Sequence, residues 1–453
     1  MKTTNFNRMQ PQSKKVTRRE FLGLSALGLT GLTILPSWTM GGIRIAPSDR
    51  VVLGFIGLGR QGIGDLHAFT HCPGVQVAAG CDVDSIKNDR FKQAVTSWQK
   101  SKGMPERCDT YEFYEQLLER KDIDAIAIAT PDHWHALNVI HSCQAGKDVY
   151  CQKPLSYNIT ESLAIVKAVR GNNRILQVGS QQRSDKEFQT AISMVRDGSL
   201  GHVKEVRVRV GEPPAPFNLP EEPVPSNLNF NQWLGPLNFP VVHYNSKMCP
   251  PIAYPELRET GDWAVWRYYR ETGNGFIGDW GAHHFDIAQA ALGMDGLTPV
   301  EYIPAGYNGT TYATMKYANG QVMTEQPFRE DKPDDKGINF IGDKAWLRVA
   351  RGYIECSDPN LLQRSEQTFA SGEYEMSPSH MQDFIDSVRS RKEPIAPVEA
   401  GASTNILFCN VNIAHELGRP VKWDPVTKRY PDDKEAEAHR LYHYEYRSPY
   451  SRI

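Results

Sequence analysis

The sequence predicts an α/β protein whose N-terminal part is built on a doubly wound parallel sheet. Three observations carry this prediction. Short β-branched runs alternate with helical segments, a glycine-rich turn joins the first run to the first helix, and an acidic residue ends the second run. The chain has 453 residues, enough for two or three domains. Its composition, 40% hydrophobic and 23% charged, excludes collagen-like, low-complexity and largely disordered proteins.

The first 40 residues differ in charge from the rest of the chain. They hold six of the 51 basic residues and one of the 53 acidic ones, a net charge of +5, which leaves 45 basic against 52 acidic residues, or −7, for the remainder. Thr17-Arg18-Arg19-Glu20-Phe21-Leu22 precedes a weakly apolar run to Leu35, the order typical of a secretory leader. That run is shorter than the ~20 apolar residues of a membrane-spanning helix.

The paired arginines resemble the twin-arginine export signal, whose substrates cross the membrane already folded. We therefore expect a leader over residues 1–40, a periplasmic location, and membrane contact only through the leader. The alternative is a disordered N-terminal arm with an incidental Arg-Arg pair.

The glycine-rich turn follows the run 50–56 and opens a helix that extends through Phe69. Its first glycine would make a tight turn, its second would let the backbone approach a pyrophosphate, and its third would permit close helix–strand packing. The N–H groups at the helix N-terminus would bind the phosphates. The residues expected to contact a dinucleotide here are Gly57, Gly59, Arg60, Gln61 and Gly62.

An acidic residue, Asp82, ends the second strand-like run, 75–81. It lies about where a carboxylate binds the adenosine ribose diol, and it would repel a 2′-phosphate. NAD is therefore predicted rather than NADP. The alternative is a glycine-rich turn without a ligand, with Asp82 as an ordinary acid at the end of a strand.

The alternation continues with strands expected over 123–129, 148–151 and 175–178 and helices over 136–145 and 161–170. Because parallel strands end at one crevice, the loops that follow them should converge there. These loops, expected at the nicotinamide end of the cofactor, carry Thr130, Pro131, Asp132, His133, Trp134, His135, Gln152, Lys153 and Pro154. Of these, Thr130 and Pro131 are among the residues expected to contact the cofactor.

Four motifs resemble those of the Gfo/Idh/MocA family (glucose–fructose oxidoreductase and inositol dehydrogenase relatives). They are Gly57-Leu-Gly59, Thr130-Pro-Asp-His-Trp-His135, Gln152-Lys-Pro154 and the segment from Gly273 to Asp286. The resemblance implies a Rossmann NAD-binding domain over 50–178 and a substrate-binding α/β domain with an open, mainly antiparallel sheet over 179–425. The tail, 426–453, is expected to be peripheral.

The resemblance also implies an NAD-dependent oxidoreductase acting on sugars, with Gln152 and Lys153 at the cofactor, His135 against the nicotinamide ribose and no metal. One departure is visible. The family usually has Glu-Lys-Pro where this chain has Gln152, so a negative partner for the lysine or the cofactor is expected to be absent.

Oxidation of a secondary alcohol needs a base for the O–H proton and an acceptor for the hydride. Asp279 and His283 stand four residues apart and would share a helix face, with the carboxylate orienting the imidazole. Lys153 would stabilise a developing alkoxide. These three are the predicted catalytic residues. The alternative for Asp279 and His283 is a helix N-terminal acid and a core histidine.

The second domain has polar side chains after a strand, at 179–184, and a segment rich in Trp and Tyr. The polar side chains could bind hydroxyl groups or equally cap a helix. Aromatic faces stack on the C–H surfaces of sugars, although an individual aromatic residue more often belongs to a core. The strand 202–210 alternates, as in a sheet with one open face, and Asn319-Gly320 predicts a hairpin. The residues expected to contact substrate are Trp134, Arg183, Trp266, Arg267, Trp280 and His284.

These observations favour an exported, NAD-dependent sugar oxidoreductase that acts on a pyranoside or polyol, preferably at C3 of a glucoside. Redox-assisted glycoside cleavage and a non-catalytic sugar- or nucleotide-binding protein are the alternatives. The near-neutral charge argues against nucleic-acid binding, and eight dispersed cysteines argue against a disulfide scaffold. The resemblance implies a homodimer or homotetramer.

Overall fold

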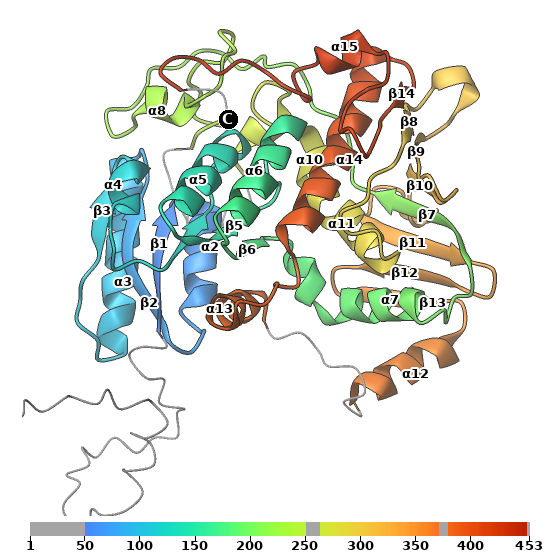
Figure 1. The fold of residues 1–453 in the computed structure, drawn as a ribbon, viewed down its shortest axis with the longest axis horizontal. Coiled ribbons are helices and arrows are strands. Elements are labelled where there is room, and N and C mark those ends of the chain that lie inside the picture. The colour runs from blue at the N-terminus through green and yellow to red at the C-terminus, as the bar shows by residue number, and fades with distance from the viewer. Residues whose placement is uncertain (1–49, 251–262, 371–378, 451–453) are drawn as a thin grey trace, which may run out of the picture. The chain divides into compact units, whose positions relative to one another are not determined.

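The computed structural model describes residues 50–250, 263–370 and 379–450 (Figure 1). The predicted leader over residues 1–40 lies outside them. No helix within the described ranges has both the length and the apolar character needed to cross a membrane.

The first sheet has six parallel strands in the order β3-β2-β1-β4-β5-β6. Strand order reverses beside β1, so the carboxyl ends of β1 and β4 flank a crevice at the topological switch point. This confirms the predicted Rossmann-type fold. The strands are β1 (Val51–Ile56), β2 (Val75–Cys81), β3 (Asp109–Tyr111), β4 (Ala125–Ile128), β5 (Asp148–Cys151) and β6 (Leu176–Val178).

Helices cover both faces of this sheet (Figure 1). The buried strands are almost entirely apolar because neither face meets water. One face packs against α2 (Arg60–Phe69), α3 (Ser85–Ser101) and α13 (His380–Ser390), and the other against α4 (Tyr114–Leu118), α5 (Asp132–Gln144) and α6 (Ile159–Gly171).

The second sheet has eight strands in the order β13-β12-β11-β7-β10-β9-β8-β14, and only the β7–β10 pair is parallel. The predicted mainly antiparallel sheet is confirmed. Asn319-Gly320 lies in the β9–β10 hairpin, where Lys316 pairs with Val322. The strands are β7 (Val203–Arg209), β8 (Glu301–Ile303), β9 (Ala313–Lys316), β10 (Val322–Glu325), β11 (Gly337–Gly342), β12 (Trp346–Ala350), β13 (Tyr353–Cys356) and β14 (Val421–Lys422).

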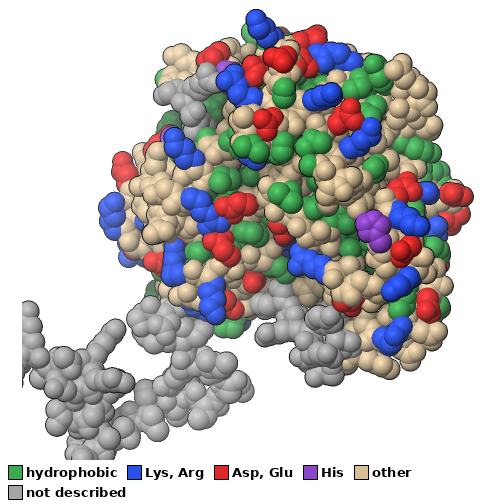
Figure 2. Space-filling view, turned by 45° about the vertical axis from the view of Figure 1, so that its right-hand side comes forward, with side chains coloured by type: hydrophobic (Ala, Val, Ile, Leu, Met, Phe, Trp, Pro, Cys, Tyr) green, Lys and Arg blue, Asp and Glu red, His purple; other side chains and the backbone are tan. Residues whose placement is uncertain are grey.

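One face of the second sheet is covered. Val206 and Val208 of β7 are fully buried beneath α7 (Lys186–Arg196), α11 (Gly281–Ala291) and α14 (Val398–Leu417), whereas Glu205 and Arg207 point to the other face and pair with each other. Figure 2 shows Lys/Arg and Asp/Glu side chains interspersed on the face that it draws.

Two C-terminal helices join the sheets. Helix α14 is buried along nearly its whole length and packs against α6 of the first sheet and α11 of the second (Figure 1). Helix α13 places Phe384 and Ile385 in the core of the first sheet. Helix α14 therefore contributes side chains to the cores of both sheets.

The C-terminal segment is not peripheral, which corrects the expectation for residues 426–453. Ala436 and Leu441 are fully buried, and Tyr444 is nearly so, all in the core of the second sheet. The segment's polar composition hid these anchors. Tyr430, for example, buries its ring and donates its hydroxyl hydrogen to Asn410 Oδ1 at 2.7 Å.

Candidate active site

A single cavity of about 740 Å³ runs from the glycine-rich turn after β1 to the loops of the second domain. Two of the residues predicted to contact the cofactor, Gly62 and His135, do not line it. The remaining residues predicted to contact the cofactor do line the cavity: Gly57, Gly59, Arg60, Gln61, Asp82, Thr130, Pro131, Gln152 and Lys153.

The three glycines of the turn act as the sequence predicts. Gly57 has φ +87°, and a Cβ there would lie 2.6 Å from the Ala129 carbonyl. A Cβ on Gly62 would lie 2.1 Å from the Gly57 oxygen, so only glycine lets α2 start this close to β1. A Cβ on Gly59 would meet nothing within 4 Å. The space above Gly59 is thus open at a helix N-terminus, which fits a pyrophosphate.

Asp82 lies at the end of β2, on the cavity wall. Its two carboxylate oxygens accept the N–H groups of Leu58, at 2.8 Å, and Asp84, at 3.0 Å. Burial raises the pKa of Asp82, and the nearby Lys87 ammonium opposes that rise. The carboxylate is therefore fixed beside the glycine-rich turn, where a ribose diol would bind.

Lys153 follows β5 and meets Asp279 across the cavity. Its Nζ donates to Asp279 Oδ1 at 2.6 Å and to the Asp279 carbonyl oxygen at 2.9 Å. Arg267 Nε lies 3.5 Å from the same Oδ1. Burial alone would raise the pKa of Asp279, but Lys153 and Arg267 outweigh it and hold that pKa below its usual range.

Asp279 does not orient His283, which corrects the expectation of one shared helix. Asp279 ends α10 (Gly275–Asp279) and His283 belongs to α11, with the break at Trp280. The carboxylate instead pairs with Lys153. Both residues still line the cavity, so the structure brings all three predicted catalytic side chains to one site.

His283 is buried, with 6% of its surface exposed. Desolvation, followed by the positive charges of Lys153 and Arg351, holds the pKa of His283 well below its ordinary value. The imidazole is therefore neutral around pH 7 and can accept a proton.

Two further charged residues, Asp132 and Arg351, lie on the cavity wall and were given no role in the sequence analysis. Asp132 begins α5, and burial raises its pKa to about 8 in spite of Lys153 and Arg267. Arg351, in the turn between β12 and β13, places its guanidinium 4.8 Å from the Trp280 ring centre. Asp132 belongs to the motif 130–135 that follows β4, whereas Arg351 lies in no motif and reaches the site from the second domain.

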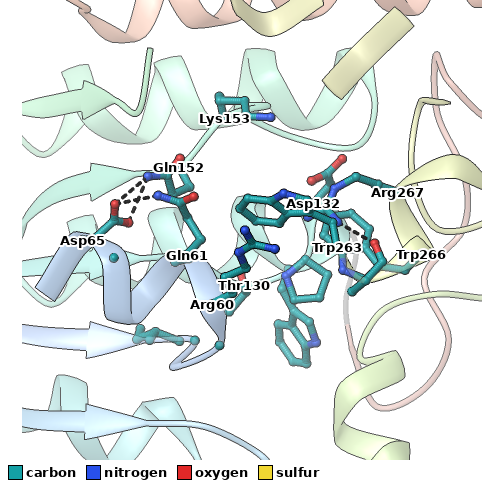
Figure 3. Close-up of a pocket in the computed structure, with 18 of the residues that line it drawn as sticks. Arg60, Gln61, Asp65, Thr130, Asp132, Gln152, Lys153, Trp263, Trp266 and Arg267 are labelled. Atoms are coloured by element: carbon teal, nitrogen blue, oxygen red, sulfur yellow. Dashed lines mark hydrogen bonds between the residues drawn. The ribbon is translucent and has the colours of Figure 1, made fainter. Parts of the chain in front are cut away.

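The three tryptophans predicted to contact substrate line the cavity. Trp134, Trp266 and Trp280 are on its wall. Trp263 joins the two domains, since the guanidinium groups of Arg60 and Arg267 lie 4.2 and 5.0 Å from its ring centre (Figure 3). Such contacts are typical of cation–π pairs.

Two of the predicted substrate contacts, Arg183 and His284, are wrong. The side chain of Arg183, predicted to bind substrate, is only 4% exposed. Its guanidinium donates hydrogen bonds to the two carboxylate oxygens of Asp286, at 2.7 and 2.8 Å, and also forms an ion pair with Asp295. His284 is fully buried with Nδ1 3.1 Å from the Arg209 carbonyl. Neither lines the cavity.

His135 also has a structural role and does not lie in the cavity, where it was expected to contact the nicotinamide ribose. Its ring nitrogens lie 2.7 Å from the Pro154 carbonyl and 2.9 Å from the Thr130 carbonyl, and burial lowers its pKa to about 4. It fixes two loops of the crevice to each other. Within the described part of the chain, no group of three or more His, Cys, Asp or Glu side chains could hold a metal ion.

Lys153 does have a negative partner, Asp279, and Gln152 itself faces a carboxylate from another element. Asp65 of α2 accepts hydrogen bonds from Gln152 Nε2, 2.9 Å from each carboxylate oxygen (Figure 3). The carboxylate that the family motif carries at position 152 is therefore replaced by one that lies 87 residues earlier in the chain.

Comparison with known proteins identifies the family of both domains. Residues 51–180 match a family model described as an oxidoreductase family with an NAD-binding Rossmann fold, and residues 215–452 match the C-terminal alpha/beta domain of that family. The WlbA dehydrogenase from Bordetella pertussis, solved with NADH and UDP-GlcNAcA, shares the fold with a TM-score of 0.57 and 16% identity, over 83% of this chain and 98% of that one.

Two curated relatives match part of the chain. A glycosyl hydrolase family 109 protein from Shewanella pealeana is 30% identical over 207 residues, 42% of this chain and 44% of the relative. An alpha-N-acetylgalactosaminidase from Shewanella oneidensis is 29% identical over 160 residues, 35% of each chain. The matched region thus spans less than half the length of these relatives. Because the two family models together cover most of the sequence and the cavity carries the corresponding glycine turn and lysine, the chain belongs to the Gfo/Idh/MocA family of oxidoreductases.

Proposed function

We propose that the protein binds NAD in this cavity and oxidises a secondary alcohol of a pyranoside or polyol, preferably C3 of a glucoside to give a 3-keto sugar. The observation that carries the proposal is the continuity of the cavity. It joins the open glycine turn and Asp82 at one end to Lys153 and His283 at the other.

NAD, when bound, supplies the hydride acceptor that no side chain can provide. The residues that would hold it are the glycines of the turn, for the pyrophosphate, and Asp82, for the ribose. Asp82 supports NAD over NADP, because its carboxylate would repel a 2′-phosphate.

The side chains supply the proton chemistry. His283 is neutral and faces the cavity, so it takes the hydroxyl proton as the C–H hydride leaves. Lys153 holds a positive charge beside the oxygen that becomes negative, and Asp279 fixes the ammonium in place through its 2.6 Å hydrogen bond. Trp266 and Trp280 offer aromatic faces to the sugar.

Redox-assisted glycoside cleavage is a second candidate, favoured by the relatives described as glycosyl hydrolase family 109 proteins. In such a reaction, transient oxidation acidifies the neighbouring C–H and permits elimination of the glycosidic bond. The same His283 and Lys153 would serve both reactions, so the product decides between them.

The paired arginines near the N-terminus support export to the periplasm, where a free NAD pool is not replenished. We infer that the cofactor is carried through the folded-protein route and stays bound. It must then be reoxidised in place, by a second sugar, by the product or by an external acceptor. The open face of the second sheet, with its Glu205–Arg207 pairs, is the proposed surface for a homodimer or homotetramer.

The test is to incubate the cofactor-loaded protein with a panel of glucosides, galactosides and inositols and to identify the products. A near-ultraviolet change of the bound cofactor together with a keto sugar supports the dehydrogenase, and a released aglycone supports the glycosidase. Binding of sugar or NAD without any turnover across the panel would leave only a binding protein.

A further inference from the structure

A carboxylic acid is buried in the wall of the cavity, close to the predicted nicotinamide end. Asp65 lies on α2, five residues after the helix begins, and only 2% of its surface is exposed. It lines the same cavity as Gln152 and Lys153. Figure 3 shows it on the side of the site opposite Asp132 and Arg267.

The partners of Asp65 are neutral. Gln61 Nε2 donates to one carboxylate oxygen at 2.8 Å, and Gln152 Nε2 donates to both at 2.9 Å. Over the residues that the structure describes, no Lys, Arg or His forms an ion pair with it. Of the titratable groups, the one electrostatically coupled to it is the Tyr150 hydroxyl on β5, which is itself held in the neutral form by burial.

An ionised carboxylate that is buried among neutral groups costs free energy unless a positive charge lies close to it. Burial raises the pKa of Asp65 to about 7, and the two amides oppose that rise only in part. The side chain is therefore close to the balance between its charged and neutral forms. A cation in the cavity would shift that balance toward the carboxylate.

The proposed cofactor provides such a cation in one of its two states. The nicotinamide ring is positively charged when oxidised and neutral when reduced. We propose that Asp65, presented through Gln152, is the countercharge of the oxidised nicotinamide, so that the protein binds NAD⁺ in preference to NADH. This inference rests on the proposed function, because it requires a nicotinamide cofactor in the cavity.

The proposal accounts for the glutamine at position 152. A glutamate there would lie against Asp65 and add a second negative charge, whereas the Gln152 amide donates to the carboxylate. Because the oxidised form is held more tightly, the arrangement favours release of the hydride from the reduced cofactor, the step by which a retained cofactor is reoxidised in place.

The experiment titrates the NAD⁺-loaded protein with NADH and reads the fluorescence of bound NADH, which gives the ratio of the two affinities directly. It is run about one pH unit above the pKa of Asp65, where the carboxyl is ionised. In Asp65→Asn, which keeps a hydrogen-bond acceptor, the preference for NAD⁺ should fall about tenfold, as expected when one close charge pair is removed.

Two further variants make the test specific. The exchange Asp65→Asn/Gln152→Glu returns a carboxylate to the pair from the other side and should restore the preference for NAD⁺. Asp82→Asn, at the ribose end, should weaken both forms by the same factor and leave the ratio unchanged. A wild-type ratio in Asp65→Asn, with thermal unfolding also unchanged, would overturn the inference alone. If the wild type binds neither form, the proposed function fails and the inference fails with it.

Discussion

Lys153→Met removes the ammonium from the site and keeps an unbranched side chain of similar length. The change deletes the 2.6 Å bond to Asp279 Oδ1 and the 2.9 Å bond to its carbonyl oxygen. It also deletes the charge that would stabilise the alkoxide. Loss of one preorganised donor to a developing oxyanion costs about 10²–10³ in kcat, or ~2.7–4 kcal/mol.

The same substitution has a second effect that can be measured. Asp279 keeps only Arg267, at 3.5 Å, among its close cations, so burial should then raise its pKa above that in the wild type. Below the raised pKa the carboxyl would be neutral, and the acidic limb of the rate profile should move to higher pH. The assay is single-turnover reduction of the bound cofactor over a pH series.

The control for this prediction is Lys167→Met, which removes an exposed ammonium on α6 and should leave kcat unchanged. If Lys153→Met retains its cofactor and turns over within about threefold of the wild type, a difference below 1 kcal/mol, the electrostatic role is refuted.

Further predictions concern the scaffold, the cofactor and the base. Arg183→Met leaves Asp286 as an unpaired buried charge and should lower the free energy of unfolding by about 3–5 kcal/mol in urea titrations; an unchanged midpoint would contradict this. Asp82→Ala should weaken NAD binding about tenfold and NADP binding less, and equal losses would argue against ribose recognition. Gly62→Ala should prevent cofactor retention, because a Cβ would lie 2.1 Å from a backbone oxygen. Because the pKa of His283 is lowered, the rate should not fall as the pH decreases through 6.5, and a half-maximal rate at 6.5 would refute a neutral buried base.

Much of the fold was predictable from local pattern. The glycine turn, the apolar runs that became β1, β4 and β5, and the Asn319-Gly320 hairpin all carry signals within a few residues. The C-terminal tail was not predictable in this way. Its anchoring residues are isolated in a polar segment, and their burial depends on a surface formed by distant helices and strands.

The site was predictable where a motif fixes a residue's position on a strand end. Lys153 and Gly57 follow buried strands, so the sheet itself delivers them to the crevice. Arg183 follows a strand as well, but its partners, Asp286 and Asp295, lie more than 100 residues away, and no local pattern pairs them with it. In the sequence, Asp65 resembles an ordinary solvent-facing acid on a helix. Only the structure shows that it is buried in the cavity wall and bonded to Gln152.

Helix continuity was the other source of error. Asp279 and His283 have the i, i+4 spacing of a shared face, but the chain breaks at Trp280 between α10 and α11. The Asp279 carboxylate instead accepts a hydrogen bond from Lys153, 126 residues away in the chain, which no local pattern indicates.

Hydride transfer from a sugar carbon to the bound cofactor is the central claim, and isotope labelling tests it most directly. The cofactor-loaded protein is mixed with a glucoside that carries deuterium at C3, and the released cofactor is analysed by mass spectrometry. The account predicts reduced cofactor that carries the deuterium, and its loss in His283→Ala. Turnover of the glucoside without deuterium in the cofactor would contradict it.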